Sequence, residues 1–469
     1  MNSSIAQGIA ADPGGALLAT GAPRGRTALV VGLGLVLALF ALYQLSRPGY
    51  ETIYDHFAWQ AQAWLEGDLS IRYPVVGTAT APGNDYFNDV IPVRDAAGNE
   101  TGRGMIPFPP LPAVVLLPLV AMFGLAVDQT FVAIVLGALD VGVAFWMLGR
   151  LPVRPLVRNL LTVFLGAGTA LWYAASLGTT WFLAHVVAVG LTLAAVGVAL
   201  DADQREAGLD PDAPRPLLDG RQVAAGLLLG LAAMSRLTVV LGIPFLLLVG
   251  GGGRWWRRCA SACVGVAIPV MALVAYNLAA TGSPFNTVYE ALYRYEVWAY
   301  PDLGYNGAWA LQDVRYIPQN LAIMLLSLPR VMPDCDPGAI REAWSASGCS
   351  WLVPDQVGMS LLLTSPAYLL ALPALRLLRD RRVAGALLAT VAIAAVNLAH
   401  FSQGWVQFGY RFSLDFAPFL LVAVAMGTRS LLGSRRGLPA GRLVLAVGLV
   451  AASVAVQAWG IAWARTFGW

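Results

Sequence analysis

The chain alternates between long apolar runs and short polar segments. The first apolar run covers residues 27–45 and follows a polar leader that carries Arg24 and Arg26. Further runs lie at 129–149, 158–175, 181–200, 222–235, 237–250, 259–280, 359–378, 383–401, 413–430 and 443–463. Because a membrane-spanning helix needs about 20 mainly apolar residues, this pattern predicts an all-α polytopic transmembrane bundle. We expect about 11 spans, with about 12 or 13 as the alternative.

Two parts of this pattern allow alternatives. The runs 222–235 and 237–250 are short and meet at Ser235–Arg236, so they form either a tight hairpin or one kinked helix. The segment Pro107–Val127 is long enough to span but is rich in proline, which breaks helices. We interpret it as a re-entrant or interfacial element. The alternative is that it spans and that 222–250 is a single helix.

Arginine positions predict the orientation, because cytoplasmic loops retain positive charge. Clusters at 254–258, 376–382 and 429–442 all fall on the cytoplasmic side of one alternating arrangement. The N-terminus is then cytoplasmic and the C-terminus is outside. The first run lacks a small-residue cleavage site, which is typical of a signal anchor. The expected parts are a cytoplasmic leader (1–26), an N-terminal transmembrane module (27–280) with an outer loop at 50–128, an extracytoplasmic loop (281–358) and C-terminal transmembrane helices (359–469).

The composition agrees with a membrane protein. Of the 469 residues, 58% are hydrophobic and 12% are charged, and the mean hydropathy is +0.65. Soluble domains carry about 25% charged residues, so this chain could not cover a soluble globule, and a soluble enzyme or a nucleic-acid-binding protein is excluded. All basic residues other than His are arginine. Codon bias explains that excess, yet each guanidinium suits bidentate contact with phosphate or carboxylate.

The first outer loop places a carboxylate close to a membrane exit. Read at helical period, an apolar stripe is formed by Ile53, Phe57, Trp64 and Leu65, which is typical of a helix lying in the membrane interface. Asp55 lies on this segment, a few residues past the first span. A carboxylate in that place can act as general base for an acceptor hydroxyl or bind a metal. The alternative is a solvated loop residue.

Four further polar side chains are candidates for contacts to acceptor, sugar or metal. Asp85 and Asp89 lie further along the same loop and are either turn residues or ligands. His56 directly follows Asp55 and is a candidate contact to an acceptor or a metal. His185 lies inside an apolar run, where a lone His is more often a hydrogen-bonded packing residue. With three His in the chain and no tight ligand spacing, a structural zinc site is not expected.

The second outer loop contains aromatic residues and two cysteines. Residues 287–300 are dense in Tyr and Trp, which suits either stacking on sugar rings or an interfacial belt. Cys335 and Cys349 flank a short loop on the side that we expect to be oxidising. We predict a disulfide between them. In the chain-entropy account, closing a loop of about 15 residues contributes about 3 kcal/mol.

Several short motifs, taken in order, resemble the GT-C superfamily of membrane glycosyltransferases. The first are an acidic residue just after the first span, an interfacial helix, and a Pro-Pro-Leu turn at 109–111 before an apolar run. The others are Gly166–Trp181 with His185, Gly226–Arg236, Tyr276–Phe285, Gly358–Pro366 and Gln407–Asp415. The superfamily includes protein O-mannosyltransferase-like and aminoarabinose-transferase-like enzymes. The resemblance runs over most of the chain.

The resemblance implies a GT-C-like bundle with its active site outside the cytoplasm. Such enzymes pass a sugar from a polyprenyl-phosphate-linked donor to an extracytoplasmic acceptor, which is a glycolipid, a cell-envelope polysaccharide or a protein, and they invert the anomeric centre. By this resemblance Asp55 is the catalytic base. A doubled acidic motif is common at the first span exit of the superfamily, whereas here His56 follows Asp55. The second acidic role, and any need for a divalent cation such as Mg²⁺ or Mn²⁺, therefore stay open.

Two arginines are candidates for binding the donor phosphate, since a leaving phosphate needs fixed positive charge near its oxygens. Arg236 lies between two short apolar helices, where a charge is costly and typical of function; a snorkelling or carboxylate-paired Arg is the alternative. Arg411 stands at the outer start of the 413–430 run, as a phosphate contact or an interface anchor. We expect Asp415 to pair with Arg411 across a helical turn. Tyr410 is a candidate acceptor or sugar contact.

Two other functions stay open. A carrier or flippase for a lipid or glycan would line a central path with charges, and a non-catalytic relative would keep the architecture alone. The chain has carboxylates in its predicted outer loops and few within its predicted spans, where Asp140 and Asp415 are the main exceptions. This placement favours an enzyme over a carrier, and the resemblance implies a hexosyl- or pentosyltransferase of the cell membrane. Its expected partners are the lipid-linked sugar, an acceptor and membrane lipid, but not nucleic acid.

Overall fold

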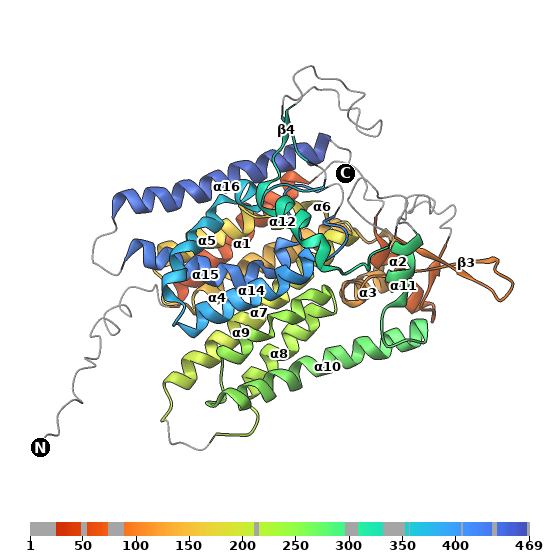
Figure 1. Ribbon diagram of the computed structural model, residues 1–469, viewed down its shortest axis with the longest axis horizontal. Coiled ribbons are helices and arrows are strands. Elements are labelled where there is room, and N and C mark those ends of the chain that lie inside the picture. Colours follow the sequence, from red (N-terminus) through yellow and green to blue (C-terminus); the bar gives the residue numbers. More distant parts are fainter. Residues whose placement is uncertain are drawn as a thin grey trace, which may run out of the picture.

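The protein is a bundle of helices that run mostly side by side, with short helices and strands gathered at one end (Figure 1). The computed structural model describes residues 25–47, 54–73, 89–210, 215–295, 308–331, 352–355, 357–404, 407–433 and 439–466. The predicted all-α bundle is confirmed for these residues. The predicted leader 1–26 lies almost entirely outside them.

The bundle helices follow the predicted apolar runs. In the first half of the chain these are α1 (Arg26–Ser46), α4 (Gln129–Leu148), α5 (Pro155–Ala167), α6 (Ala170–Leu177), α7 (Thr180–Ala207), α8 (Gly220–Ala233), η4 (Leu237–Gly242), α9 (Ile243–Leu248) and α10 (Trp255–Thr281). In the second half they are α13 (Leu361–Thr364), η9 (Pro366–Leu377), α14 (Arg381–Leu398), α15 (Ser413–Leu432) and α16 (Ala440–Thr466).

Seven of the described helices are long and apolar enough to cross a membrane, namely α1, α4, α7, α10, α14, α15 and α16. The pair α5 and α6, bent by 48° at its break, would make an eighth. The chain is therefore a multi-pass membrane protein. The count of about 11 spans, which relies on the shorter helices as well, stays a prediction.

Helices α8 and η4–α9 form a hairpin. Gln222, at the start of α8, donates from Nε2 to the carbonyl oxygens of Leu246 at 2.6 Å and Val249 at 3.3 Å, at the end of α9. Such bonds need two antiparallel segments, so the single kinked helix is the wrong alternative. Helix α8 also packs closely against α10, where a Cβ at Gly226 would clash with the carbonyl oxygen of Ala262.

The proline-rich segment forms a short helix, α3 (Leu111–Phe123), followed by the single turn η3 (Gly124–Ala126). Thirteen helical residues extend about 20 Å, which is less than the roughly 30 Å of a hydrocarbon core. The backbone N–H of Leu111 donates to the carbonyl of Met234 at 3.1 Å. The segment therefore begins beside the tip of the α8 hairpin, which fits the re-entrant or interfacial interpretation.

The two predicted outer loops contain strands that could not be predicted from the sequence. Strands β1 (Ile71–Arg72), β2 (Ile91–Arg94) and β3 (Glu100–Met105) form an antiparallel sheet in the order β1-β3-β2. A second pair joins β4 (Arg330–Val331) to β5 (Leu352–Val353). The strands are short and show no clear alternation of apolar and polar residues, so their sequence carries little strand signal.

Elements of the two predicted outer loops lie at the same end of the bundle. The helices here are α2 (His56–Leu65), α3, α11 (Thr287–Tyr295), the turn η7 (Val314–Tyr316) and α12 (Ile317–Leu326). In Figure 1, α2, α3, α11 and β3 lie together at the right-hand end. Asn286, just before α11, donates from its side chain to the carbonyl of Pro107, just before α3. The two loops thus meet over one end of the bundle.

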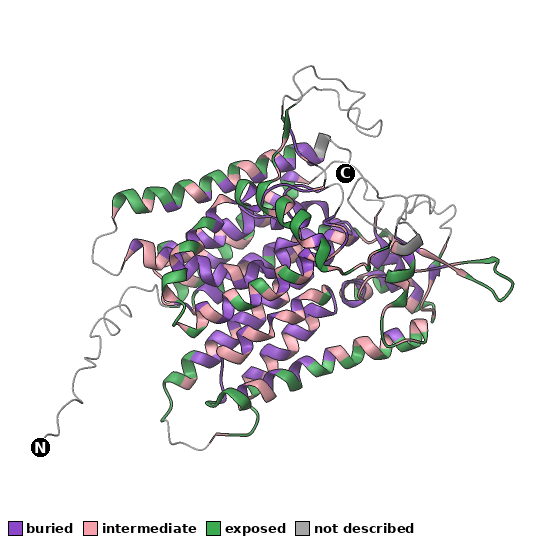
Figure 2. Cartoon of the chain, viewed as in Figure 1, coloured by how far each residue is buried: buried purple, intermediate pink, exposed green. Residues whose placement is uncertain are grey.

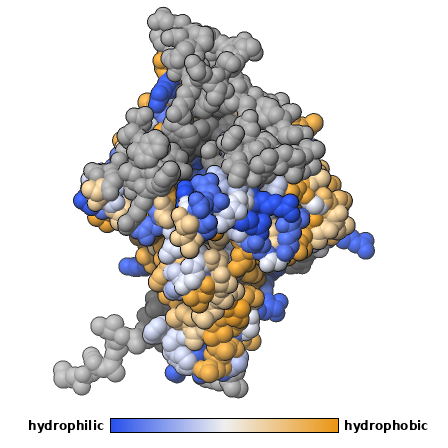
Figure 3. Space-filling view, turned by 90° about the vertical axis from the view of Figure 1, so that its right-hand side faces the viewer, coloured by the Kyte–Doolittle hydropathy of each residue, from blue (hydrophilic) through white to orange (hydrophobic). Residues whose placement is uncertain are grey.

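Burial separates inner from outer helices (Figure 2). The apolar windows of α7 and α15 are the most buried of the candidate spans, whereas those of α1, α10 and α16 are mostly exposed. The exposed apolar side chains of α10 include Val264, Ile268 and Met271. Seen from the end that carries α2 and β3, hydrophilic residues gather across the middle of the molecule and an apolar surface lies below them (Figure 3). Helices α7 and α15 therefore position the polar groups described next.

Candidate active site

Asp55 is a buried carboxylate with one unsatisfied oxygen. It precedes α2 and is 8% exposed. Its Oδ1 is buried and accepts no hydrogen bond from any described residue. Burial raises the pKa of the Asp55 carboxyl to about 7. Such a group is poised to lose and accept a proton near neutral pH, which is what a general base requires.

A clamp between the starts of α2 and α7 positions Asp55. The backbone N–H of His56 donates to Thr180 Oγ1 at 3.1 Å, and His56 Nδ1 lies 3.0 Å from the same oxygen. In return, the backbone N–H of Thr180 donates to the carbonyl of Tyr54 at 3.0 Å. The two residues that flank Asp55 in sequence are therefore fixed to α7. His56 has a structural partner, and its contact to a substrate or metal stays a prediction.

The predicted apolar stripe of α2 is only partly right. Phe57 is buried, but Leu65 is 47% exposed, and Trp59 on another face is almost fully buried. Ile53 lies outside the described residues. Helix α2 is buried around most of its surface because it packs against α3 and the start of α7, rather than lying with one face in lipid.

Asp89 binds Trp181, whose ring also packs against Tyr54 and His56. Its Oδ2 accepts from Trp181 Nε1 at 2.8 Å, and the Trp181 ring lies 5.0 Å from Tyr54 and 5.7 Å from His56. Burial raises the pKa of Asp89 to about 6, although the Trp181 bond and the Arg411 charge act in the opposite direction. Its φ of 61° is unusual for a non-glycine residue, and such strain is concentrated at functional sites.

Arg411 is a partly buried cation that is not ion-paired with any described carboxylate. Its Cζ lies 5.4 Å from the centre of the Phe182 ring and 5.5 Å from that of Phe412. Its Nε is buried, and the side chain makes no hydrogen bond or ion pair within the part of the chain that the structure describes. Burial lowers the pKa of Arg411 to about 10, and the nearby Arg236 charge adds to this effect. A buried charge without an ion-pair partner is costly, so this side chain is suited to binding an anion.

The backbone before α15 holds Arg411 in place. Tyr410 OH donates to Gln403 Oε1 at 2.6 Å, and Gln403 Nε2 donates to the carbonyl of Asn397 at 3.0 Å. Gly409 has a φ of +72°, which allows the tight turn before Tyr410. The Tyr410 hydroxyl therefore supports the loop, and its predicted role as an acceptor or sugar contact is untested.

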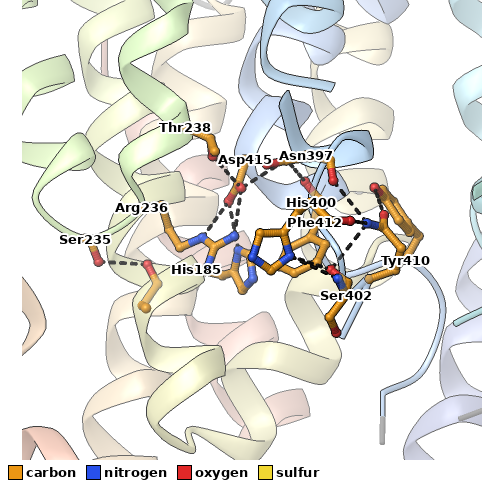
Figure 4. Close-up of polar contacts among 12 residues, drawn as sticks. His185, Ser235, Arg236, Thr238, Asn397, His400, Ser402, Tyr410, Phe412 and Asp415 are labelled. Atoms are coloured by element: carbon orange, nitrogen blue, oxygen red, sulfur yellow. Dashed lines mark hydrogen bonds and ion pairs between the residues drawn. The ribbon is translucent and has the colours of Figure 1, made fainter. Parts of the chain in front are cut away.

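A second polar cluster surrounds Asp415, which is fully buried on α15 (Figure 4). Arg236 makes a bidentate pair with it, through Nε at 3.1 Å and Nη2 at 3.0 Å. The other contacts come from His185 Nδ1 at 3.0 Å, Thr238 Oγ1 at 2.9 Å and Asn397 Nδ2 at 3.1 Å. The predicted Arg411–Asp415 pair is wrong, because Arg411 lies over aromatic rings and the α8–η4 turn brings Arg236 to the carboxylate.

The overall arrangement of the helices is found in solved membrane enzymes. The oligosaccharyltransferase of Archaeoglobus fulgidus in its apo form superposes with a TM-score of 0.52, at 14% identity, over 94% of this chain and 56% of that one. The same enzyme tethered to an acceptor peptide with the NVT sequon gives 0.50, at 14% identity, over 93% and 55%. The chain therefore shares the fold of this archaeal enzyme.

The likeness is confined to the fold. ArnT from Cupriavidus metallidurans, solved with undecaprenyl phosphate, is a weaker match, with a TM-score of 0.46 at 14% identity. The alignment covers 94% of this chain and 76% of ArnT. This chain spans just over half the length of the archaeal enzyme. No protein-family model matches the sequence, and no curated protein matches it significantly. The GT-C resemblance of the sequence is thus confirmed at the level of the fold.

The predicted site residues form two groups. His56 and Asp89 contact Trp181, with Asp55 next to His56 in the chain, whereas His185 and Arg236 bind Asp415. Arg411 and Arg236 both lie beside Phe412. His185 is hydrogen-bonded and buried, as expected for a packing residue, although its Nε2 has no partner within the described chain. Asp85, Cys335 and Cys349 lie outside the described residues, so their roles stay predictions.

One contact between α11 and the segment after α14 could not be predicted from the sequence. His400, just after α14, lies 2.7 Å through Nε2 from the hydroxyl of Tyr289 on α11. Burial lowers the pKa of His400 to about 4, so it is neutral at physiological pH. No local signal could have revealed a pair separated by more than 100 residues. In the described residues no three His, Cys, Asp or Glu side chains gather as a metal site would require. The need for a divalent cation, left open by the sequence, is not decided by this.

Proposed function

We propose that the protein transfers a sugar from a polyprenyl-phosphate-linked donor to an extracytoplasmic acceptor with inversion. The observation that carries the proposal is that a chain of contacts links the guanidinium of Arg411, which has no ion-pair partner in the described residues, to the segment that holds the buried carboxylate of Asp55. Contacts join them in sequence, since Tyr54 touches Trp181, Trp181 binds Asp89, and Asp89 interacts electrostatically with Arg411. The GT-C fold supports the proposal independently.

Asp55 acts as the base. Its free Oδ1 accepts the proton of an acceptor hydroxyl while that oxygen attacks the anomeric carbon of the donor sugar. The bond between that carbon and the phosphate oxygen breaks, and the phosphate takes the bonding electrons. Attack from the face opposite to the phosphate inverts the anomeric centre. Because the pKa of Asp55 is about 7, a useful fraction of the carboxyl is ionised at neutral pH.

Arg411 and Arg236 receive the leaving lipid phosphate. Negative charge grows on the phosphate oxygens as the bond breaks, and fixed cations near them lower the barrier. Arg411 has no competing carboxylate bonded to it. Arg236 keeps Nη1 without a hydrogen bond to any described residue, and 24% of its side chain is exposed. A guanidinium also suits the geometry of phosphate oxygens.

The acceptor is a glycan, a lipid or a protein outside the cytoplasm. The archaeal oligosaccharyltransferase has been solved with an acceptor peptide, which supports a protein as one of these classes. The arginine clusters support an orientation with the N-terminus in the cytoplasm and the end that carries α2 and α11 outside.

A donor panel tests the function. Purified protein in lipid nanodiscs is supplied with radiolabelled polyprenyl-phosphate hexoses and pentoses and with an extract of cell-envelope acceptors. We expect label to move from one donor into acceptor material, and the new linkage to have the anomeric configuration opposite to that of the donor. No transfer from any donor, or retention of configuration, would overturn the proposal.

The rate should depend on pH through Asp55. Protonated Asp55 cannot accept a proton, so kcat/KM should rise tenfold per pH unit well below pH 7 and level off above it. The measurement is a pH profile of transfer between pH 5 and 9. Asp89→Asn removes the other carboxyl of the site whose pKa is raised, and in this variant the change in kcat/KM near pH 7 should remain. A profile that is flat across this range would contradict the assignment.

A further inference from the structure

Asp415 is at the centre of a cluster drawn from four parts of the chain. Its carboxylate is bound by His185 from α7, by Arg236 and Thr238 from the α8–η4 turn, and by Asn397 from α14 (Figure 4). These four residues make five hydrogen bonds to Asp415, which use the full acceptor capacity of a carboxylate. The Asp415 side chain is also fully buried. Its partners therefore fix its position, and Asp415 fixes the positions of its partners.

Two guanidiniums share one aromatic ring beside this cluster. Arg236 Cζ lies 5.1 Å from the centre of the Phe412 ring, and Arg411 Cζ lies 5.5 Å from it. The positive charges of Arg236 and Arg411 repel each other. Asp415 is bonded to Arg236 and not to Arg411. The group of two arginines and one carboxylate therefore keeps a net positive charge of about one.

We propose that Asp415 is a positioning residue that fixes the Arg236 guanidinium so that Nη1 faces the leaving phosphate. This inference rests on the proposed function, because it assigns a role within the same phosphate site. The bidentate pair uses Nε and Nη2 and thereby sets the plane of the guanidinium. His185, Thr238 and Asn397 hold the carboxylate, so Arg236 is oriented before any ligand binds.

The charge of Asp415 makes this role distinguishable from simple electrostatics. A carboxylate beside an anion site repels the anion, so its removal alone should tighten phosphate binding. A positioning residue has the opposite effect on catalysis, because a displacement of about 1 Å in a catalytic group can cost about 100-fold in rate. Affinity and turnover should therefore change in opposite directions when Asp415 loses its charge.

The test measures binding and turnover separately in three variants. Asp415→Asn should bind polyprenyl phosphate at least as tightly as the wild type, yet lose about 30-fold to 100-fold in kcat. Arg236→Lys keeps the charge but cannot make the bidentate pair; it should bind polyprenyl phosphate within about threefold of the wild type and show a similar loss of kcat. Asp95→Asn removes a carboxylate from the exposed turn between β2 and β3, away from this cluster, and should keep kcat within about threefold.

The outcomes separate this inference from the proposed function. If the wild type transfers sugar and both Asp415→Asn and Arg236→Lys retain its kcat, Asp415 has no positioning role. A loss in affinity alone, with kcat unchanged, also overturns the inference. If Asp415→Asn does not fold, as judged by its melting temperature and elution as a single species, Arg236→Lys decides the question. Failure of the wild type to transfer any sugar would instead overturn the proposed function.

Discussion

Asp55→Asn should lower the rate of sugar transfer by about 10²-fold to 10⁴-fold, the range typical of a lost general base. The amide has nearly the shape of the carboxyl but cannot accept the proton of an acceptor hydroxyl. Folding should be unaffected, because Oδ1 accepts no hydrogen bond from the described residues and the group forms no ion pair there. The measurement is kcat for transfer, with the melting temperature as a check of folding.

Asp95→Asn provides the matched control. Asp95 lies in the exposed turn between β2 and β3, where Asn is equally suited to a turn. Its variant should transfer sugar at the wild-type rate. A well-folded Asp55→Asn protein that also works at the wild-type rate would exclude Asp55 as the base.

Arg411→Gln should lose activity and gain stability. Removing a fixed cation from a developing phosphate charge costs about 10²-fold to 10³-fold in kcat by analogy with the loss of one oxyanion donor. The same change removes a partly buried charge that has no bonded partner in the described chain, so the melting temperature should rise. This pairing of lower activity with higher stability is expected where a binding site stores an unfavourable charge.

Arg236→Gln is the control of opposite sign. It also removes a guanidinium from the site, but it leaves the buried carboxylate of Asp415 without its cation. Breaking a buried pair in this way is destabilising, so this variant should lose both activity and melting temperature. Equal stability changes in the two variants would show that Arg411 is not an unpaired charge held for a ligand.

The sequence predicted the elements better than the contacts between them. The apolar runs gave the bundle because a buried transmembrane helix needs little beyond length and hydrophobicity. The charged break at Ser235–Arg236 indicated a functional turn, which the structure places beside Asp415. Asp55 was predicted as the candidate base from its position a few residues after the first span. Each of these signals is local.

The parts that could not be predicted depend on distant pairs. Arg236 and Asp415 are 179 residues apart, and Asp89 and Trp181 are 92 apart. Within the sequence, Arg411 was the nearer partner for Asp415 at helical spacing. Tertiary packing overrode this spacing, because Arg411 precedes the first turn of α15 and lies against Phe182. The strands near Asp89 were missed because they are too short to show a period.

Photocrosslinking tests the central claim most directly. A polyprenyl phosphate with a photoreactive group next to its phosphate is irradiated with the purified protein, and the labelled peptides are identified by mass spectrometry. The account predicts adducts in the segments around Arg236 and Arg411, which excess polyprenyl phosphate prevents and which Arg411→Gln weakens. Adducts confined to the lipid-facing surfaces of α10 and α16, with none that excess ligand removes near these arginines, would contradict it.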